Sequence, residues 1–524
     1  MRNILSTLFA FLLVTLVYGQ GKESFIQGGF RYTIDRYGDV YISDARDSVA
    51  VPLSEDGTLV IPSSVEYGDT VYHVKMIDSG AFGCMPDIKH VIISEGIEQF
   101  GKYSFYRCTK LESIHFPSTF WTFPECNEFL IGCCNLKRIT VDERNEDYAS
   151  PDDCNAIVRK DEKKLIFGCL GTNIPPTVTA IDFGAFGQCE KLESIVIPEG
   201  VRVIEPCAFR NCVNLREVSL PNSLEGIGYS VFNGCMSLES VTIPPNVSEI
   251  RGHDGFYAAW NLFGGCYNLK EVRVDKRNRT FDSRNNCNAL VHTATDVIVA
   301  ACGASVIDKS IRGIGDFAFA HSSIRKIRIP KGVRRIGNGA FWMCEACNDI
   351  SVDPRNPVYN SKDNSNAIIE TATGRLMHGC RLTRIPDNVR EIGDSAFYGV
   401  RLPSHLIIPE GVETIGTFAF TRFCGLEYVR MPSTLKLIKQ NAFAYCEHLC
   451  YVDMSLCSPK AEMFAFSGCK HLNMVDFSPT MGDIHQLSFS GCPCEKWVEA
   501  HAQQVNGGLS QEGLIMKSNN EQNY

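Results

Sequence analysis

Cysteine is the residue type in this sequence with the widest scope for chemistry. The chain of 524 residues contains 24 cysteines, and Cys344-Glu345-Ala346-Cys347 has the spacing of a redox or zinc-binding pair. A structural zinc site needs four ligands, but no second Cys-x-x-Cys and no nearby histidine supplies the other two. We therefore predict that Cys344 and Cys347 have structural roles.

Three segments rich in Asp and Asn are the next candidates, because these residue types ligate calcium. They are Val141–Asn145, Val274–Asn278 and Val352–Asn356, and an Asn-Ala pair and then a cysteine follow each at matching distances. Their spacing does not match an EF-hand loop. Turn capping by Asp and Asn side chains is the alternative that we favour, and we expect neither a metal nor another cofactor.

Catalytic signatures are missing from the sequence. It contains no His-Glu-x-x-His, no Gly-x-Ser-x-Gly, no phosphate-binding Gly-Lys-Ser/Thr loop and no dinucleotide fingerprint in a βαβ setting. The 12 histidines and the carboxylates are spread along the chain without a grouped nucleophile, base and orienting residue. We predict that the protein is not an enzyme.

A repeat of 23 residues determines where all these residues lie. The pattern that ends in Ala185-Phe186, Cys189, Leu192, Ile195 and Ile197-Pro198 recurs 23 residues later with every anchor in place. Self-similarity at a period between 20 and 50 residues indicates a solenoid. The repeated phenylalanine is found at Phe82, Phe105, Phe186, Phe209, Phe232, Phe263, Phe319, Phe341, Phe397, Phe420, Phe443, Phe466 and Phe489.

Each coil has a simple physical interpretation. Leu-x-x-Ile-x-Ile places apolar residues at every second position, which suits a strand with one buried face, and the following proline ends that strand. Ile-Gly places a buried side chain beside a permissive backbone corner. Ala-Phe fills the interior of the coil. Because one coil cannot bury its own apolar face, the coils must stack into a continuous core.

The full pattern, Ile-Gly-x-x-Ala-Phe-x-x-Cys-x-x-Leu-x-x-Ile-x-Ile-Pro, resembles the BspA-like leucine-rich repeat, also called the Treponema pallidum type. The resemblance covers residues 76–491. It implies a mainly β fold, a curved leucine-rich-repeat solenoid with a parallel β-sheet. It also implies an exported, surface-associated protein, often of host-associated bacteria, that binds rather than catalyses. The three Asp- and Asn-rich segments belong to larger variant coils, each with a β-hairpin.

The two ends of the chain differ from the repeat. Residues 1–19 combine a basic start, an apolar run from Ile4 to Val17, and small residues at Val17 and Gly19 before the cut, which is typical of a cleaved secretory signal peptide. That run is too short to span a membrane. We expect a β cap at residues 20–75, and at 492–524 a cap with a helical turn from Glu495 and a loose tail. The predicted location is secreted or cell-surface, with no membrane-spanning segment.

Most cysteines occupy one position of the repeat. Neighbouring coils lie about 4.8 Å apart, and equivalent side chains with parallel Cα–Cβ vectors keep the Cβ atoms too far apart for a disulfide. We predict a column of buried thiols at Cys84, Cys108, Cys189, Cys212, Cys235, Cys266, Cys344, Cys446, Cys469 and Cys492. In the variant coils, the sequence does not decide whether Cys154 forms a disulfide with Cys169 and Cys287 with Cys302.

Charge is distributed unevenly. The net charge of −9 argues against a nucleic-acid binder, but residues 270–335 carry 14 Lys and Arg against 6 Asp and Glu, a local charge of +8. The basic candidates for ligand binding, which we expect to face outward, are Lys270, Arg273, Arg325, Lys326 and Arg328. Tyr257 and Trp260 are candidates on an inserted aromatic loop. The alternative is a solvated face balanced by acidic neighbours.

Three function classes fit these observations. The first is an exported, adhesin-like interaction protein that binds a host or neighbouring-cell protein. The second binds acidic or sulfated glycans through the basic residues. The third is a structural envelope protein without a dedicated ligand. In each case we expect a monomer.

Overall fold

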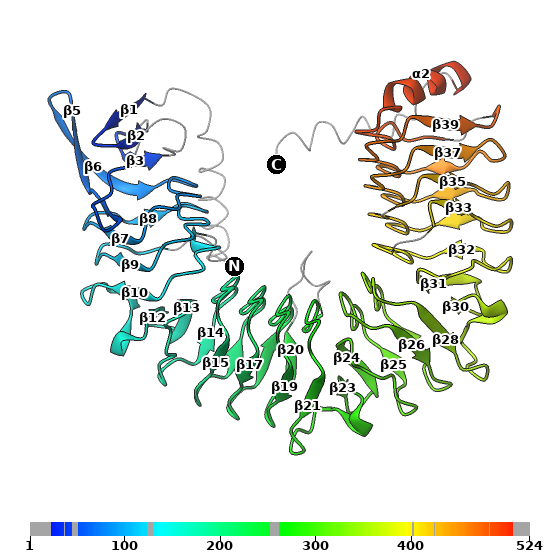
Figure 1. Cartoon of the computed structure of the whole chain (residues 1–524), viewed down its shortest axis with the longest axis horizontal. Coiled ribbons are helices and arrows are strands. Elements are labelled where there is room, and N and C mark those ends of the chain that lie inside the picture. The colour runs from blue at the N-terminus through cyan, green and yellow to red at the C-terminus, as the bar shows by residue number, and fades with distance from the viewer. Residues whose placement is uncertain are drawn as a thin grey trace, which may run out of the picture. The chain divides into compact units, whose positions relative to one another are not determined.

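The structure is a computed structural model, which describes residues 23–35, 37–43, 51–122, 129–251, 261–400, 403–423, 425–480 and 483–506. The predicted signal peptide, the tail from residue 507, Tyr257 and Trp260 lie outside these residues. The chain divides into two compact units, residues 1–215 and 216–524. Figure 1 labels their elements.

The first unit begins with antiparallel strands. β1 pairs with β2 and β2 with β3, while β5 and β6 form a hairpin. These strands occupy the segment expected to form a β cap. Their bounds are Glu23–Gln27 (β1), Phe30–Ile34 (β2), Val40–Ser43 (β3), Ser64–Tyr67 (β5) and Thr70–Ile77 (β6).

The rest of the first unit is built mainly from parallel ladders. One sheet has the order β10-β9-β7-β4, and in a second ladder β13, β14 and β16 lie side by side. The bounds are Thr58–Ile61 (β4), His90–Ile93 (β7), Gln99–Phe100 (β8), Ser113–Phe116 (β9), Arg138–Val141 (β10), Tyr148–Ala149 (β11), Ala156–Arg159 (β12), Lys164–Gly168 (β13), Ala180–Ile181 (β14), Ser194–Val196 (β15) and Val203–Ile204 (β16), with a 3-10 turn at Pro151–Asp153.

The second unit continues the same plan with two kinds of strand. The strands of the Leu-x-x-Ile-x-Ile segments form one layer, which confirms the predicted parallel sheet. They are Glu217–Ser219 (β17), Ser240–Ile243 (β19), Glu271–Val274 (β21), Lys326–Ile329 (β26), Asp349–Val352 (β28), His405–Ile407 (β33), Tyr428–Arg430 (β35), Tyr451–Met454 (β37) and Met474–Phe477 (β39).

A second layer, absent from our sequence interpretation, consists of very short strands that contain the isoleucine of most Ile-Gly pairs. The members in the second unit are Gly226–Gly228 (β18), Glu249–Arg251 (β20), Gly313–Ile314 (β25), Arg335–Ile336 (β27), Glu391–Ile392 (β32), Thr414–Ile415 (β34), Leu437–Ile438 (β36) and Lys460–Ala461 (β38). The glycine is required here for close approach. A Cβ at Gly416 would lie 2.6 Å from the amide nitrogen of Asp394 in the preceding coil.

The variant coils contain the hairpins that the sequence predicts. In the third, β30 (Ala367–Glu370) pairs with β31 (Arg375–Gly379) in antiparallel register. In the first, β12 pairs with β13, and in the second β23 (Ala289–His292) pairs with β24 (Val297–Ala301). The remaining elements are Phe281–Asp282 (β22), Tyr359–Asn360 (β29) and the 3-10 turns Arg284–Asn286 and Lys362–Asn364.

Asparagine side chains fasten the variant coils to their neighbours. Buried Asn356 donates to the carbonyl oxygens of Pro330 (2.8 Å) and Val333 (3.0 Å) and accepts from the amides of Val358 and Tyr359. Asn145 and Asn278 make the same set of bonds. Together with the aspartates, which bind the amide and guanidinium of the arginine two residues on, these bonds confirm turn capping.

The axial core contains the repeated phenylalanines. Rings of consecutive coils stack, with centroids 5.1 Å apart between Phe397 and Phe420 and 4.8 Å apart between Phe420 and Phe443. Left-handed backbone angles are found directly before an Ala-Phe pair and two residues after its phenylalanine, even where the residue is large, as at Phe418 (φ 56°) and Tyr445 (φ 57°). The turn geometry therefore follows from the stack and not from a glycine requirement.

The cysteine column is present, although Cys189 is only partly buried, and its thiols have a bonding role that we did not predict. Cys212, Cys344 and Cys446 each donate the S–H to the carbonyl oxygen of the phenylalanine one coil earlier, at 3.1 to 3.2 Å. Burial raises the pKa of Cys344 to about 12, so the thiol keeps its proton. Cys344 is therefore a structural residue, as predicted.

The cysteine prediction is wrong at one residue, and the structure answers the question of the two disulfides. The inclusion of Cys84 in the column is wrong, because this residue is exposed and lies two residues after Phe82, where the column lies three residues after its phenylalanine. Every cysteine in the described residues is a reduced thiol. The open pairs, Cys154 with Cys169 and Cys287 with Cys302, are thus unbridged in this structure.

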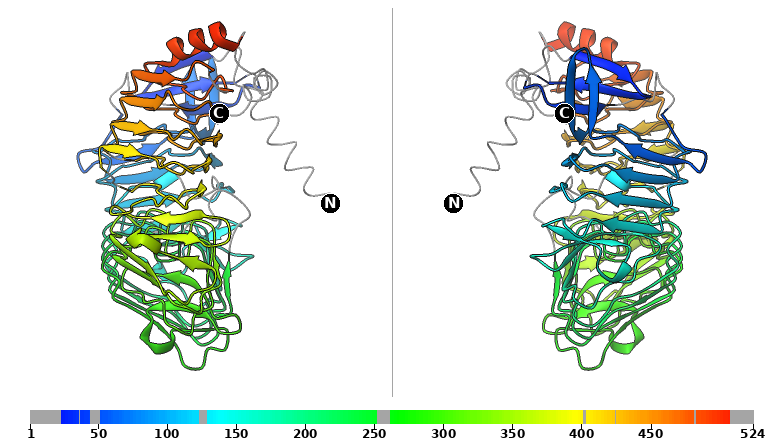
Figure 2. Two further views of the ribbon diagram at one scale, coloured as in Figure 1. Left: turned by 90° about the vertical axis from the view of Figure 1, so that its right-hand side faces the viewer. Right: turned by 90° about the vertical axis from the view of Figure 1, so that its left-hand side faces the viewer.

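The far end of the second unit is closed by α2, Glu495–Asn506, where we expected a helical turn. Its Trp497 and His501 rings stack near Phe477 of β39, at centroid distances of 6.1 and 5.7 Å. Figure 2 shows this helix lying across the end of the strand stack. The curvature of the solenoid and the domain boundaries at residues 19, 75 and 491 remain predictions.

The thiol column predicts a sharp pattern of cysteine reactivity. Residue-resolved alkylation of the native protein is expected to modify exposed Cys84 and Cys450 quickly and buried Cys212, Cys446 and Cys469 only after denaturation. Denaturation without a reductant should release the column thiols. A disulfide between any two column cysteines in peptide mapping would contradict this prediction.

The asparagine bonds predict a loss of stability. Asn356→Ala removes four hydrogen bonds from a buried side chain, so the free energy of unfolding should fall by about 2–4 kcal/mol in denaturant titration. Asn348→Ala is the control, because Asn348 is exposed in the same coil. Equal effects of the two substitutions would contradict the role given to Asn356.

Candidate functional site

Five of the predicted binding residues form what we call the basic face: Lys270, Arg273, Arg325, Lys326 and Arg328. All are exposed, as predicted for outward positions at or next to β21 and β26. β21 pairs with β19 and β26 with β28, so the two groups lie on separate two-stranded sheets. The structure therefore does not unite the five residues in a single ladder.

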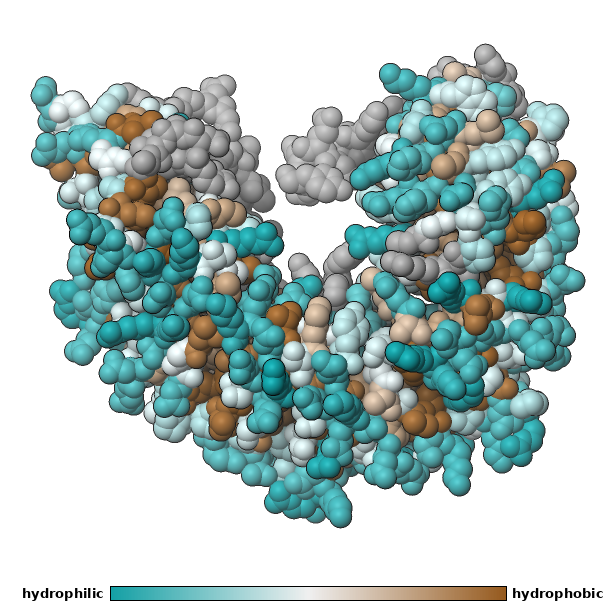
Figure 3. Space-filling model, in the orientation of Figure 1, coloured by the Kyte–Doolittle hydropathy of each residue, from teal (hydrophilic) through white to brown (hydrophobic). Residues whose placement is uncertain are grey.

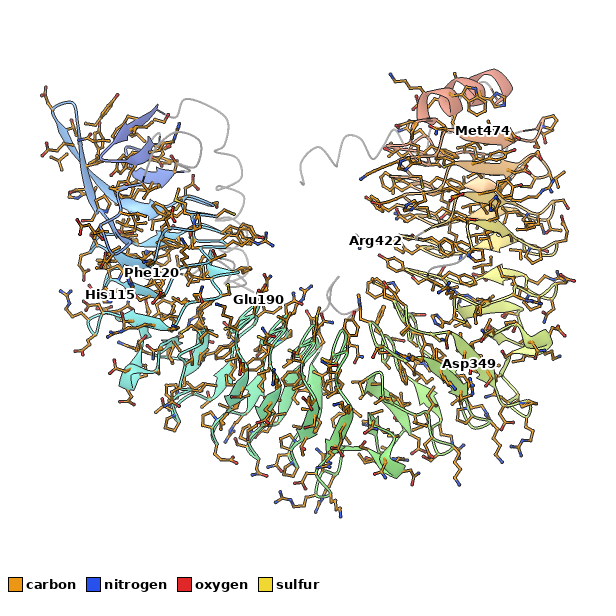
Figure 4. The ribbon with its side chains drawn as sticks, in the orientation of Figure 1. His115, Phe120, Glu190, Asp349, Arg422 and Met474 are labelled. Atoms are coloured by element: carbon orange, nitrogen blue, oxygen red, sulfur yellow. The ribbon has the colours of Figure 1, made fainter. Side chains whose placement is uncertain are left out.

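Carboxylates already neutralise three members of the basic face. Lys270 lies 3.6 Å from Glu239, and Arg273 lies 2.6 Å from Glu271. Arg328 donates to Asp349 of β28 at 2.8 Å, and this hydrogen bond lowers the pKa of the Asp349 carboxyl. Figure 4 labels Asp349 in the strand layer. These pairs match the alternative of a face balanced by acidic neighbours.

Arg325 and Lys326 carry the remaining exposed charge. Neither has a carboxylate within ion-pairing distance in the described part of the chain. A depression of about 770 Å³ opens at the other ends of these strands, where β26 and β28 finish, with Arg328, Pro330, Asp353 and Arg355 in its wall. The basic face is thus a mixed-charge surface with a cationic edge.

A second surface was missed by our sequence interpretation. In the sheet β33-β35-β37-β39 the register aligns His405 with Tyr428, Tyr428 with Tyr451, and Tyr451 with Met474. We call these four residues the aromatic strip. In Figure 1 the four strands lie one above another, and Figure 4 labels Met474 on the last. The sequence could have revealed the strip, because its four residues follow one another at intervals of 23.

Contacts hold the aromatic strip in place. The rings of His405 and Tyr428 lie 5.6 Å apart and those of Tyr428 and Tyr451 5.2 Å apart. Tyr428 donates its hydroxyl to Asp453 at 3.3 Å, and Tyr451 donates to Asp476, which raises the pKa of Tyr451 to about 12. Both hydroxyls stay protonated, so the strip offers rings and hydrogen bonds and no nucleophile.

Apolar side chains beside the rings extend this surface. Met474 is 55% exposed and Ile407, in the neighbouring column, is 66% exposed. Arg430 completes that column with a 3.2 Å ion pair to Asp453. Tyr, Met and Arg are enriched at protein interfaces, where aromatic and Arg side chains supply most hot spots. In the space-filling view, hydrophobic residues appear as separate patches on a largely hydrophilic surface (Figure 3).

Metal binding finds no support in the described residues. There, no group of three His, Cys, Asp or Glu side chains could hold a metal ion. The aspartates of the variant coils are occupied by arginine: Asp275, for example, accepts from Arg277 at 2.8 to 3.0 Å, and these bonds lower its pKa to about 2.

The repeat match establishes the family. The family described as BspA type leucine rich repeat region matches residues 64–150, 170–290, 304–368 and 377–496, well over half of the chain, in six copies. The chain belongs to this family, as the resemblance predicted. The family is a non-enzymatic repeat scaffold whose members are typically surface proteins, and its fold is suited to protein interaction.

The chain is also similar to several proteins of solved structure. A leucine-rich cell surface protein from Faecalibacterium prausnitzii is 20% identical, with 88% of this chain and 96% of that chain covered and a TM-score of 0.36. The pneumococcal vaccine antigen PcpA is 18% identical, with 86% and 90% covered and a TM-score of 0.35. A leucine-rich repeat protein from Bacteroides ovatus is 23% identical, with 86% and 94% covered and a TM-score of 0.31.

Two further findings concern the curated proteins and the helices of this structure. No protein with a curated description matches the chain. Within the residues that the structure describes, no helix has the length and apolar character needed to cross a membrane.

Proposed function

We propose that this protein is an exported, surface-displayed interaction protein, adhesin-like, which binds another protein through the outward faces of its strands. The proposal includes the signal peptide at residues 1–19 with cleavage near Gly19, a β cap at 20–75, the solenoid at 76–491 and a C-terminal cap at 492–524. It takes the mature protein to be a monomer.

The aromatic strip carries this proposal. Its side chains project outward from a rigid ladder, so they present fixed rings at little entropic cost on binding. The core does not need them, because the inward residues of the same strands, Val429, Val452 and Val475, are already buried. An exposed apolar surface with polar neighbours marks an interaction site.

A second candidate function rests on Arg325 and Lys326. These exposed cations, with the local charge of +8, would attract an acidic or sulfated glycan, and that binding would weaken with salt. Lys270, Arg273 and Arg328 contribute less, because they are paired. Tyr257 and Trp260 stay candidates on their loop. A structural envelope role without a ligand is the third class.

Paired variants separate the first two functions. We would screen the mature protein against extracellular-matrix proteins and a sulfated glycan array, and then test Ile407→Asp with Met474→Asp against Arg325→Glu with Lys326→Glu. If the protein function is right, the first pair should weaken binding by at least about tenfold. The second pair should abolish any salt-sensitive glycan binding.

Val196→Asp is the matched control, because Val196 is 71% exposed on β15, outside both surfaces. It should leave protein and glycan binding unchanged. Protein binding that survives the Ile407 and Met474 substitutions in a folded variant would refute the role of the surface that the aromatic strip forms with Ile407. A failure of every ligand in both screens would favour the structural role.

A further inference from the structure

The third variant coil interrupts the row of stacked Ala-Phe turns. In regular coils the amide of the phenylalanine donates to the next coil, as Phe397 does to the carbonyl of Ala419 at 2.8 Å. Between Phe341 and Phe397 the hairpin strand β31 takes this place, and Gly379 donates to Ala396 at 3.0 Å. Phe341 therefore has His378 as its ring neighbour, at a centroid distance of 5.3 Å.

The three variant coils differ in what fills the space at this interruption of the ring stack. Two residues before the coil's own cysteine stand Phe167 in the first, Ala300 in the second and His378 in the third. Phe167 packs on Phe129 at 5.5 Å. In the second coil the flanking turns meet directly, because Gly265 donates to the carbonyl of His321 at 2.8 Å. In the third, a cavity of about 320 Å³ remains.

The walls of this cavity include four large aromatic side chains. Phe317, Phe341, Trp342 and Phe418 line it, and Phe418 is 39% exposed, so the cavity reaches the surface. Trp342 is held by its ring contact with Tyr398, at 4.9 Å. The volume lies at the lower end of the range for small-molecule sites, which suits one or two fused rings.

The two charged side chains of the cavity wall pair with each other, although Nε of Arg375 has no hydrogen-bond partner of its own in the described residues. Arg375 donates to Asp394 at 2.7 Å, and Asp394 also accepts from the amide of Thr417 at 2.8 Å. His378 is 7% exposed, and its Nε2 has no hydrogen-bond partner in the described residues. Burial lowers the pKa of His378 to about 4, so the imidazole is neutral near pH 7. A buried polar atom without a partner costs about 1–3 kcal/mol.

We propose that this cavity is a binding site for a small aromatic molecule with one hydrogen-bonding group, a phenol or an indole. The ring lies among Phe317, Trp342 and Phe418, and the hydroxyl or ring N–H bonds to Nε2 of His378. This site is separate from both surfaces of the proposed function.

Calorimetric titration of the mature protein with indole and with 4-methylphenol tests the proposal. Both should bind, and His378→Phe should weaken binding at least tenfold, because the phenylalanine refills the space as Phe167 does in the first variant coil. His448→Phe, at an exposed position outside every proposed site, is the control and should bind as the unmodified protein does.

A third probe, N-acetyl-tyrosinamide, distinguishes a free molecule from a tyrosine side chain of a bound protein. Binding of the two small probes alone supports a free ligand, and binding of all three supports a site that also accepts a side chain. Absence of binding at millimolar concentrations, or equal binding to folded His378→Phe, would overturn the proposal.

Should His378→Phe fail to fold, His378→Ala provides the second test, since Ala300 occupies this place in the second variant coil. This variant should bind toluene as well as it binds 4-methylphenol, whereas the unmodified protein should prefer 4-methylphenol. The same preference in both proteins would show that His378 does not contact the ligand.

Discussion

The distance between successive coils is the constraint on which the rest of the structure depends. Phenylalanine rings of neighbouring coils are 4.8 to 5.1 Å apart from Phe397 to Phe489, close to the spacing of hydrogen-bonded strands. The strand ladder, the ring stack and the thiol column share this one repeat distance. A residue type that suits one coil therefore suits every coil.

This constraint divides each coil into residues that support the stack and residues that are available for recognition. Inward side chains, the Ala-Phe turn and the column cysteine satisfy packing and backbone bonding. Outward strand positions take no part in this packing or bonding. Their residue types therefore differ from coil to coil, as in the basic face and the aromatic strip. The cavity beside His378 follows the same logic, because it lies where a variant coil breaks the ring stack.

The sequence predicted the coil well, because every buried contact recurs 23 residues later. It did not reveal the short second layer, since two-residue strands carry no alternating pattern of their own. Cys84 was misplaced by one position because the repeat was read by residue type and not by distance from Phe82. The pairing of Arg328 with Asp349 could not be predicted, because side chains 21 residues apart meet only once the coils are stacked.

Residue-resolved hydrogen exchange of the Ala-Phe turns tests the central claim most directly. The amides of Phe397, Phe420 and Phe443 donate to the alanine carbonyl of the next coil at 2.7 to 2.8 Å. If coil stacking holds the structure together, these amides should exchange slowly and as a group. Rapid exchange at Phe420 and Phe443 in the native protein would contradict the account.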